Sequence, residues 1–318
     1  MSAASAPPTV VAHADWGVEA KKRWVAVAML QPDGHYAADV PRPVGVAGTL
    51  LDRMGLPPLS SGPALLGFDF PIGLPRAYAA KTGISFFPDV LGQFGAGEWS
   101  RFWEVADAPE NISLHRPFYP SRPGGRKLSH LTDALDLDRA ELFRRCELKT
   151  LARRAACPLF WTLGGNQVGK GALSGWRILQ PALQASDTAI WPFHGRLTSC
   201  LQSASTVVAE TYPAEFYGHL GVRFDHLTGG KRTEGGRAAQ AEALLRWASN
   251  HDVELTAGHR ETIASGFGIR LDGEDRFDAL IGLFGMLNVV HGNRPPGDPH
   301  NDAATSVEGW ILGQTADP

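Results

Sequence analysis

The sequence has few cysteines, and it has no apolar run long enough to cross a membrane. Of its 318 residues only Cys146, Cys157 and Cys200 are cysteines, and no two of them form a Cys-x-x-Cys pair. An odd number of scattered cysteines argues against a disulfide framework and a structural zinc site, and it favours a reducing compartment. A membrane span needs roughly 20 apolar residues. We therefore expect a soluble cytoplasmic protein without a membrane partner.

The chain also lacks a basic excess and the common motifs of zinc and serine hydrolases. It carries 30 basic and 33 acidic residues, for a net charge of −3. Proteins that bind DNA without regard to sequence usually have a basic excess, so this balance counts mildly against such a binder. The eleven histidines form no His-x-x-x-His or His-Glu-x-x-His pair, and no Gly-x-Ser-x-Gly segment occurs. Zinc chemistry and serine hydrolysis are therefore not favoured.

Instead, three short apolar runs each end on an acid: Thr9–Asp15, Pro63–Asp69 and Thr206–Glu210. Such unbroken apolar runs are typical of strands buried on both faces of a parallel sheet. A fourth acid, Asp278, opens an apolar helical run. Sites in open α/β sheets lie at the carboxyl ends of the strands. We therefore expect these acids to meet at one edge of a sheet.

Converging carboxylates repel one another unless a proton or a cation lies between them, and Mg²⁺ or Mn²⁺ suits an all-oxygen site. Asp15, Asp69, Glu210 and Asp278 are thus candidate metal ligands and catalytic residues. The alternatives are structural. Each Asp can serve as a turn or helix-cap residue, Asp275 shares the face of Asp278, and Glu210 can pair with an arginine elsewhere. Gly282 and Gly285 would let the helix of Asp278 lie close to the sheet.

The chain divides into a core in two pieces, residues 1–74 and 206–318, and an insertion, residues 75–205. We expect core strands at residues 9–17, 23–30, 35–40, 64–70 and 206–212, and core helices at 46–54, 237–249 and 275–290. The insertion is rich in aromatic residues, Gly and Pro, and should be mainly helical or irregular. Its clearest expected helix is Asp138–Ala156.

Basic residues supply candidates for phosphate contact. Arg145 and Lys149 recur at a spacing of four on the expected helix, and Lys231 and Arg232 lie in a Gly-rich loop. A basic stripe on a helix is more often a solvated face with acidic neighbours, and this alternative stays open. Backbone amides in a Gly-rich loop can help to cradle an anion.

Six short segments carry a resemblance to a known family. They are Ala14–Gly17, Gly67–Gly73, Glu210–Pro213, Gly230–Arg232, Asp275–Leu280 and Glu308–Ile311. In this order the chain resembles the domain-of-unknown-function 429 family, whose members are predicted ribonuclease H-like nucleases. The resemblance implies an α/β fold, with a ribonuclease H-like mixed sheet flanked by helices and a large insertion.

The resemblance also implies a site and a reaction. Ribonuclease H-like nucleases bind two divalent metals through acids on the first strand, the fourth strand and a C-terminal helix. The matching positions here are Asp15, Asp69 and Asp278, with Glu210 as a nearby fourth acid. The implied activity is hydrolysis of a phosphodiester, in nucleic acid or another substrate, with Mg²⁺ or Mn²⁺ as cofactor.

Two other functions remain open on sequence grounds. A phosphotransferase of the sugar kinase and actin type shares the same core, but it needs a duplicated domain and a second Gly-rich phosphate hairpin, and neither is found. A non-catalytic binding or scaffolding protein could keep the fold and use the aromatic insertion to bind a partner.

Overall fold

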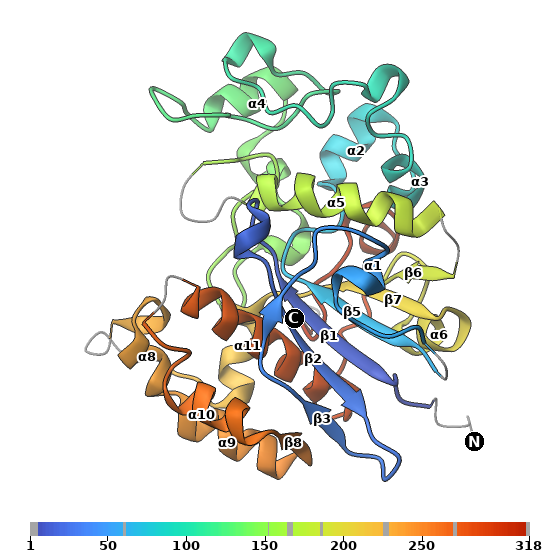
Figure 1. The fold of residues 1–318 in the computed structure, drawn as a ribbon. Helices are drawn as coiled ribbons and strands as arrows, with labels where there is room; N and C mark the ends of the chain where they lie inside the picture. The colour runs from blue at the N-terminus through green and yellow to red at the C-terminus, as the bar shows by residue number, and fades with distance from the viewer. Residues whose placement is uncertain are drawn as a thin grey trace.

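The computed structural model describes residues 6–59, 62–151, 153–163, 168–184, 187–224, 229–269 and 272–315. The chain is an α/β protein with one mixed sheet of eight strands flanked by helices (Figure 1). The strand order is β6-β7-β5-β1-β2-β3-β8, and β4 pairs with β2. The strands are β1 Val10–Asp15, β2 Trp24–Leu30, β3 Tyr36–Ala38, β4 Arg42–Pro43, β5 Ala64–Phe68, β6 Thr188–Ile190, β7 Thr206–Glu210 and β8 Val253–Leu255.

The strand directions place three carboxyl ends at one edge of the sheet. β1 pairs in parallel with β5, and β5 pairs in parallel with β7. The hairpin partner β2 runs antiparallel to both β1 and β3. The apolar runs that suggested a buried parallel sheet are these three parallel strands. The acids that end them therefore lie near one another along this edge.

Alternate residues of each strand face two separate apolar cores, as the strand period of two requires. Val10 and Ala12 of β1 face one core, which includes α1, α5 and the insertion, whereas Val11 faces the other. Helix α11 fills the second core and packs directly on β1 and β2. The α-helices of the described residues are α1 Leu50–Arg53, α2 Arg76–Thr82, α3 Phe87–Leu91, α4 Ser129–Leu135, α5 Val168–Gln184, α6 Leu197–Ser203, α7 Pro213–Phe216, α8 Glu234–Ala238, α9 Ala241–Asn250, α10 Ala257–Ala264 and α11 Gly273–Val290.

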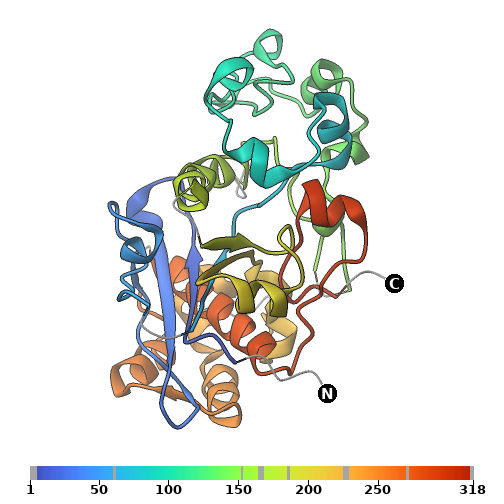
Figure 2. The same ribbon diagram turned by 90° about the vertical axis from the view of Figure 1, so that its right-hand side faces the viewer.

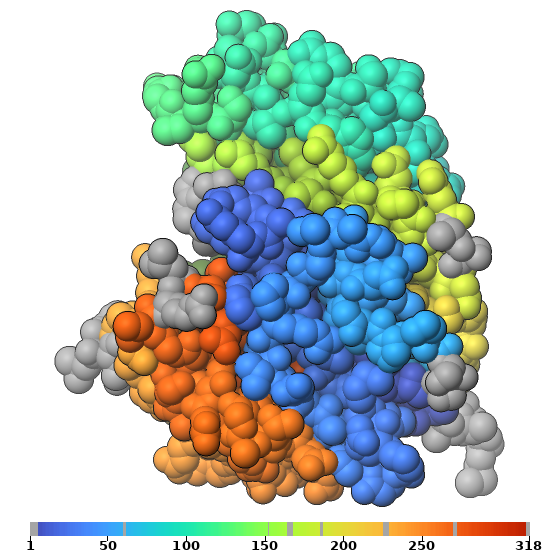
Figure 3. All heavy atoms as spheres, viewed as in Figure 1, coloured from blue at the N-terminus to red at the C-terminus, as the bar shows by residue number. Residues whose placement is uncertain are grey.

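The insertion forms a lobe beside the core, and α5 lies between the lobe and the sheet (Figures 1 and 2). The space-filling view shows the same lobe covering one end of the molecule (Figure 3). Gly175 of α5 lets the helix press on the ring of Phe70, just beyond β5. The sheet also takes β6 from within residues 75–205, because β6 pairs in parallel with β7. The segment assigned to the insertion therefore returns to the core before residue 206.

The expected helix Asp138–Ala156 is wrong. The described part of this segment, which omits Ala152, forms two short 3₁₀ turns, Arg139–Leu142 and Arg145–Glu147, and then irregular chain. The side chain of Arg153 donates to the backbone carbonyls of Leu148 and Arg154 at 3.1 Å each. Side-chain hydrogen bonds of this kind satisfy carbonyls that a helix would have satisfied itself, so tertiary contacts override helix propensity here.

Candidate active-site cleft

Asp15 and Asp69 form a carboxyl pair at the ends of β1 and β5. The strand period places Asp15 on the same face of the sheet as Val11, the face that α11 covers. Asp69 follows directly after β5, and its Oδ1 accepts a hydrogen bond of 2.7 Å from the backbone N–H of Trp16. The carboxyl groups of Asp15 and Asp69 lie close enough together to interact directly. The sequence prediction that these two acids meet is confirmed.

Burial and mutual repulsion raise the pKa values of both acids. The pKa of Asp15 lies well above its ordinary value, first because the carboxyl is buried and then because Asp69, Asp278 and Asp275 repel its charge. Burial raises the pKa of Asp69 to about 6, although the Trp16 N–H opposes the rise. One proton shared by the pair relieves the repulsion, and a bound cation would relieve it equally well.

Asp278 faces this pair from the first turns of α11. The helix lies close to β1 because Gly282 has no side chain, and a methyl group there would collide with the ring of His13. His13 in turn makes a contact of 3.1 Å with the carbonyl of Ala279. The prediction that Gly282 lets α11 approach the sheet is confirmed. Gly285 makes a different close contact, against Phe216 of α7.

Lys231 and Tyr217 hold the carboxylate of Asp278. The Lys231 ammonium contacts Asp278 and lies 3.3 Å from Glu274, and the Tyr217 hydroxyl donates to Asp278 over 3.3 Å. Burial raises the pKa of Asp278, although Lys231 opposes the rise. Burial alone would lower the pKa of Lys231, but Asp278 reverses this and raises it above its ordinary value. Lys231 is therefore a fixed positive charge at the site.

A buried arginine holds the loop that carries Lys231. The guanidinium of Arg237 donates to the carbonyls of Lys231, Gly266 and Gly268, each at 2.8 Å. Gly273, the first residue of α11, leaves room for this guanidinium. The lysine loop and the start of α11 are thus joined through one side chain. The sequence suggested Arg237 only as a possible anion contact beside Lys231 and Arg232, because nothing local marks an arginine that binds distant carbonyls.

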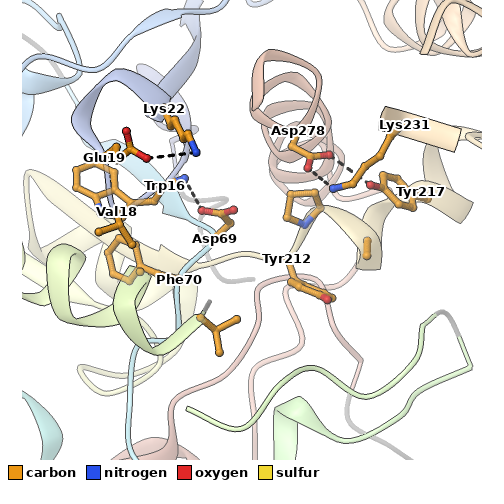
Figure 4. Close-up of a pocket in the computed structure, with 15 residues that line it drawn as sticks. Trp16, Val18, Glu19, Lys22, Asp69, Phe70, Tyr212, Tyr217, Lys231 and Asp278 are labelled. Carbon is orange, nitrogen blue, oxygen red and sulfur yellow. Dashed lines mark hydrogen bonds and ion pairs between the residues drawn. The ribbon is translucent and has the colours of Figure 1, made fainter. Parts of the chain in front are cut away.

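Asp69, Asp278, Lys231 and Tyr217 line a cleft of about 420 Å³, whereas Asp15 and Arg237 are not among its lining residues. In Figure 4, Asp69 lies on one side with Trp16, and Asp278 lies on the other with Lys231 and Tyr217. Val18, Glu19, Lys22, Phe70 and Tyr212 complete the labelled lining. Sequence reasoning missed the aromatic lining. The sequence offered one signal for these aromatic residues, their position along the chain. Trp16, Phe70 and Tyr212 all follow within two residues of a strand end.

Glu210 does not join the other three acids. Its register partner Phe68 faces the core that contains the insertion, so Glu210 points to the opposite face of the sheet from Asp15. There Arg144 donates to both of its oxygens at 2.7 Å, and the backbone N–H of Ile72 donates at 2.6 Å. The structure therefore supports the alternative reading, in which Glu210 pairs with an arginine of the insertion, and not its roles as catalytic residue and metal ligand.

Of the four basic candidates, only Lys231 lines the cleft. Arg232 is exposed outside the cleft lining. Arg145 lines a separate hollow beside α2, and Lys149 is exposed on the irregular segment where a helix was expected. The structure therefore does not bring Arg232, Arg145 and Lys149 to the carboxylates. Asp275, the alternative to Asp278, is near enough to repel Asp15, and burial raises its pKa to about 6.

The donor set fits a hard cation in part. Across the described residues, no three His, Cys, Asp or Glu side chains are close enough together to hold a metal ion. Asp15 and Asp69 do provide two neighbouring carboxyl groups. Mg²⁺ commonly binds one or two carboxylates and takes its remaining ligands from water and substrate phosphates. The pair therefore fits such an ion, whereas Asp278 would first have to release Lys231.

Comparisons with protein-family models, curated proteins and solved structures find no match. The resemblance to the domain-of-unknown-function 429 family therefore stays a prediction. Within the described residues, no helix has both the length and the apolar character that a membrane crossing needs.

Proposed function

We propose that the protein is a divalent-metal-dependent phosphodiester hydrolase that acts at the Asp15–Asp69 pair. The observation that carries the proposal is the close approach of these two half-buried acids at adjacent strand ends, where Asp69 lines a cleft opposite Asp278 and Lys231. Buried like charges are costly, and pKa values perturbed by burial together with a charged neighbour are typical of functional sites.

The order of elements supports a ribonuclease H-like core. The hairpin β1–β2–β3 comes first, then β5 and β7 join in parallel beside β1, and the late helix α11 packs on β1. This is the order that the resemblance implies, and Asp15, Asp69 and Asp278 occupy its three acidic positions. A cytoplasmic location remains part of the proposal and rests on the scarcity of cysteine.

Asp15 and Asp69 would hold the cation. A bound Mg²⁺ or Mn²⁺ would supply a nucleophilic water at neutral pH and would polarise the phosphoryl group. The second cation of the implied two-metal site would need Asp278, whose oxygens contact Lys231 and Tyr217.

The remaining residues of the cleft bind and orient the substrate. Lys231 provides a positive charge that suits a phosphate oxygen, and Arg237 keeps its backbone in place. Lys22 adds a second, exposed positive charge on the opposite side of the cleft. Asp278 fixes the direction of the Lys231 ammonium, because its carboxylate contacts the ammonium and also accepts a hydrogen bond from Tyr217. These charges attract a phosphodiester although the net charge of the chain is −3.

Calorimetry and a cleavage assay test the proposal together. We expect the wild-type protein to bind Mn²⁺ and to cleave a labelled oligonucleotide in the presence of Mg²⁺ or Mn²⁺. Asp15→Asn and Asp69→Asn should each remove most of the binding and reduce cleavage by about 100-fold or more, since each removes one of the two proposed metal ligands.

Asp89→Asn is the matched control, because Asp89 is an exposed acid on α3, outside the cleft. It should bind and cleave like the wild type. Cleavage that persists in both cleft variants would contradict the proposal. Absence of divalent-metal binding by the wild type would contradict it as well, and would favour a non-catalytic binding protein.

A further inference from the structure

Aromatic side chains line the cleft beside the carboxylates. Trp16 and Phe70 belong to the Asp69 side, and their ring centroids lie 5.8 Å apart in an edge-to-face contact. Tyr212 lies below the gap between Asp69 and Asp278 in the view of Figure 4. Trp16 and Phe70 are buried, but Tyr212 is only half-buried. Tyr217 is half-buried as well, but its hydroxyl donates to Asp278, so Tyr212 is the ring best placed to meet a ligand.

The guanidinium of Arg153 lies over one face of the Tyr212 ring. The guanidinium carbon of Arg153 lies 4.9 Å from the ring centroid. Arg153 is buried and cannot move easily, because it lies 3.1 Å from Glu215 and donates to the side chain of Gln314 over 2.9 Å. A cation over one face of a ring attracts it and fixes its orientation. A flat ligand in the cleft would thus meet a ring that is already oriented.

Burial raises the pKa of the Tyr212 hydroxyl, so the ring is uncharged at neutral pH. A neutral aromatic ring does not repel a phosphodiester. It can stack on any base, because every nucleobase has a flat face. By contrast, Lys231 and Lys22 supply the positive charges of the cleft lining.

We propose that Tyr212 stacks on a base of single-stranded nucleic acid whose phosphodiester lies against Asp69 and Lys231. The inference rests on the proposed function and adds the substrate class to it. A cleft of about 420 Å³ has the size of a small-ligand site. In a duplex the base faces are covered by their neighbours, so only an unstacked base can reach the ring.

Binding measured by fluorescence anisotropy tests this inference apart from catalysis. The probes are a fluorescein-labelled oligothymidylate, an abasic oligomer of the same length and charge, and the duplex of the oligothymidylate with its complement. Ca²⁺ replaces Mg²⁺ in the buffer. We expect the wild type to bind the oligothymidylate about tenfold more tightly than either other probe, a factor within the range for stacking of one base.

Tyr212→Leu should remove this preference, whereas Tyr212→Phe, which keeps the ring, should retain it. Trp103→Leu is the control, because Trp103 is a partly buried aromatic residue of the insertion that does not line the cleft. Equal binding of all three probes by the wild type would overturn the inference, and so would an unchanged preference in Tyr212→Leu. A preference that depends on Tyr212 without metal-dependent cleavage would support the inference while contradicting the proposed hydrolysis.

Discussion

Asp15 and Asp69 lie close together at the ends of adjacent strands. Burial raises the pKa of both groups, and the charge of Asp69 raises the pKa of Asp15 further. The folded chain therefore binds protons at these acids at pH values where the unfolded chain has released them. The raised pKa values lower the stability of the metal-free protein at neutral pH, a cost that a bound cation at the two acids would offset.

The pH dependence of stability should report this proton. The pKa of Asp69 is raised to about 6 in the folded state. The folded state therefore binds more protons than the unfolded state from about pH 4 to somewhat above pH 6. The stability of the wild type in EDTA, measured relative to Asp69→Asn, should fall as the pH rises through this window, because both proteins share the opposite contribution of the histidines whose pKa burial lowers. Asp69→Asn, which has no proton to lose, should be more stable than the wild type at pH 8 by on the order of 1–3 kcal/mol. Urea denaturation at pH 4 and pH 8 measures both effects.

Asp89→Asn again provides the comparison, since its exposed side chain should leave the pH profile unchanged. Excess Mn²⁺ should stabilise the wild type at pH 8 but not Asp69→Asn, because only the wild type keeps both oxygen ligands. A wild-type stability in EDTA that rises from pH 4 to pH 8 relative to Asp69→Asn would contradict the raised pKa of Asp69.

Sequence patterns could identify Asp15, Asp69 and Asp278, because a charged residue at the end of an apolar run is visible without a structure. Glu210 ends an equally apolar strand, yet it serves the opposite face. Only the pairing of β7 with β5 decides this, since a shift of one residue would exchange the two faces. The register depends on contacts between strands far apart in the chain, and no local pattern states it.

At the scale of elements, α11 determines where Asp278 lies. The helix carries Asp278 one turn before Gly282, the residue that contacts β1 through His13. Burial lowers the pKa of His13 to about 3, so the ring is neutral beside the helix. The spacing between the two sides of the cleft therefore depends on how closely one glycine lets the helix approach.

Gly282→Ala should separate α11 from β1. The added methyl group would meet the His13 ring, and overpacking of this kind costs about 1–3 kcal/mol of unfolding free energy. Metal or substrate affinity at the cleft should fall as well, because Asp278 and its partner Lys231 would move with the helix. Gly258→Ala is the matched change, since a methyl group there meets open space in α10. Equal stability of the two variants would contradict the close packing.

The surroundings of each segment decided whether its helix could be predicted from the sequence. The segment 275–290 is apolar all round and became the buried helix α11. The segment 138–156 has better helix formers but remained largely irregular, because Arg144 and Arg153 reach into buried ion pairs. Helix α5 was not expected, because Gly169, Gly171 and Gly175 weaken a helix and only their packing contacts explain them. Local propensity cannot report either kind of contact.

At the scale of the whole molecule, a buried ion-pair cluster joins the insertion to the core. Arg144 belongs to the insertion and is fully buried. It pairs with Glu147 at 2.9 Å and with Glu210 of β7 at 2.7 Å, and it donates to the carbonyl of Glu308 at 3.0 Å. One side chain therefore connects the insertion, the sheet and the C-terminal segment.

Arg144→Met should destabilise the protein by about 3–5 kcal/mol, because it leaves the carboxylates of Glu147 and Glu210 buried without their counter-charge. Adding Glu210→Gln should recover part of the loss. Lys81→Met breaks the exposed Lys81–Asp136 pair and should cost less than about 1 kcal/mol. Guanidinium denaturation of the four proteins provides the measurement. A small effect of Arg144→Met would show that the insertion is held by its apolar contacts alone.

The two sides of the cleft come from segments that lie far apart along the chain. Asp15 and Asp69 come from strands made early, whereas Lys231 and Asp278 come from segments made late. During synthesis on the ribosome, the nascent chain therefore exposes two acids long before the helix that opposes them has emerged. The proposed hydrolase would therefore stay inert beside messenger and ribosomal RNA until the segments that carry Lys231 and Asp278 have emerged.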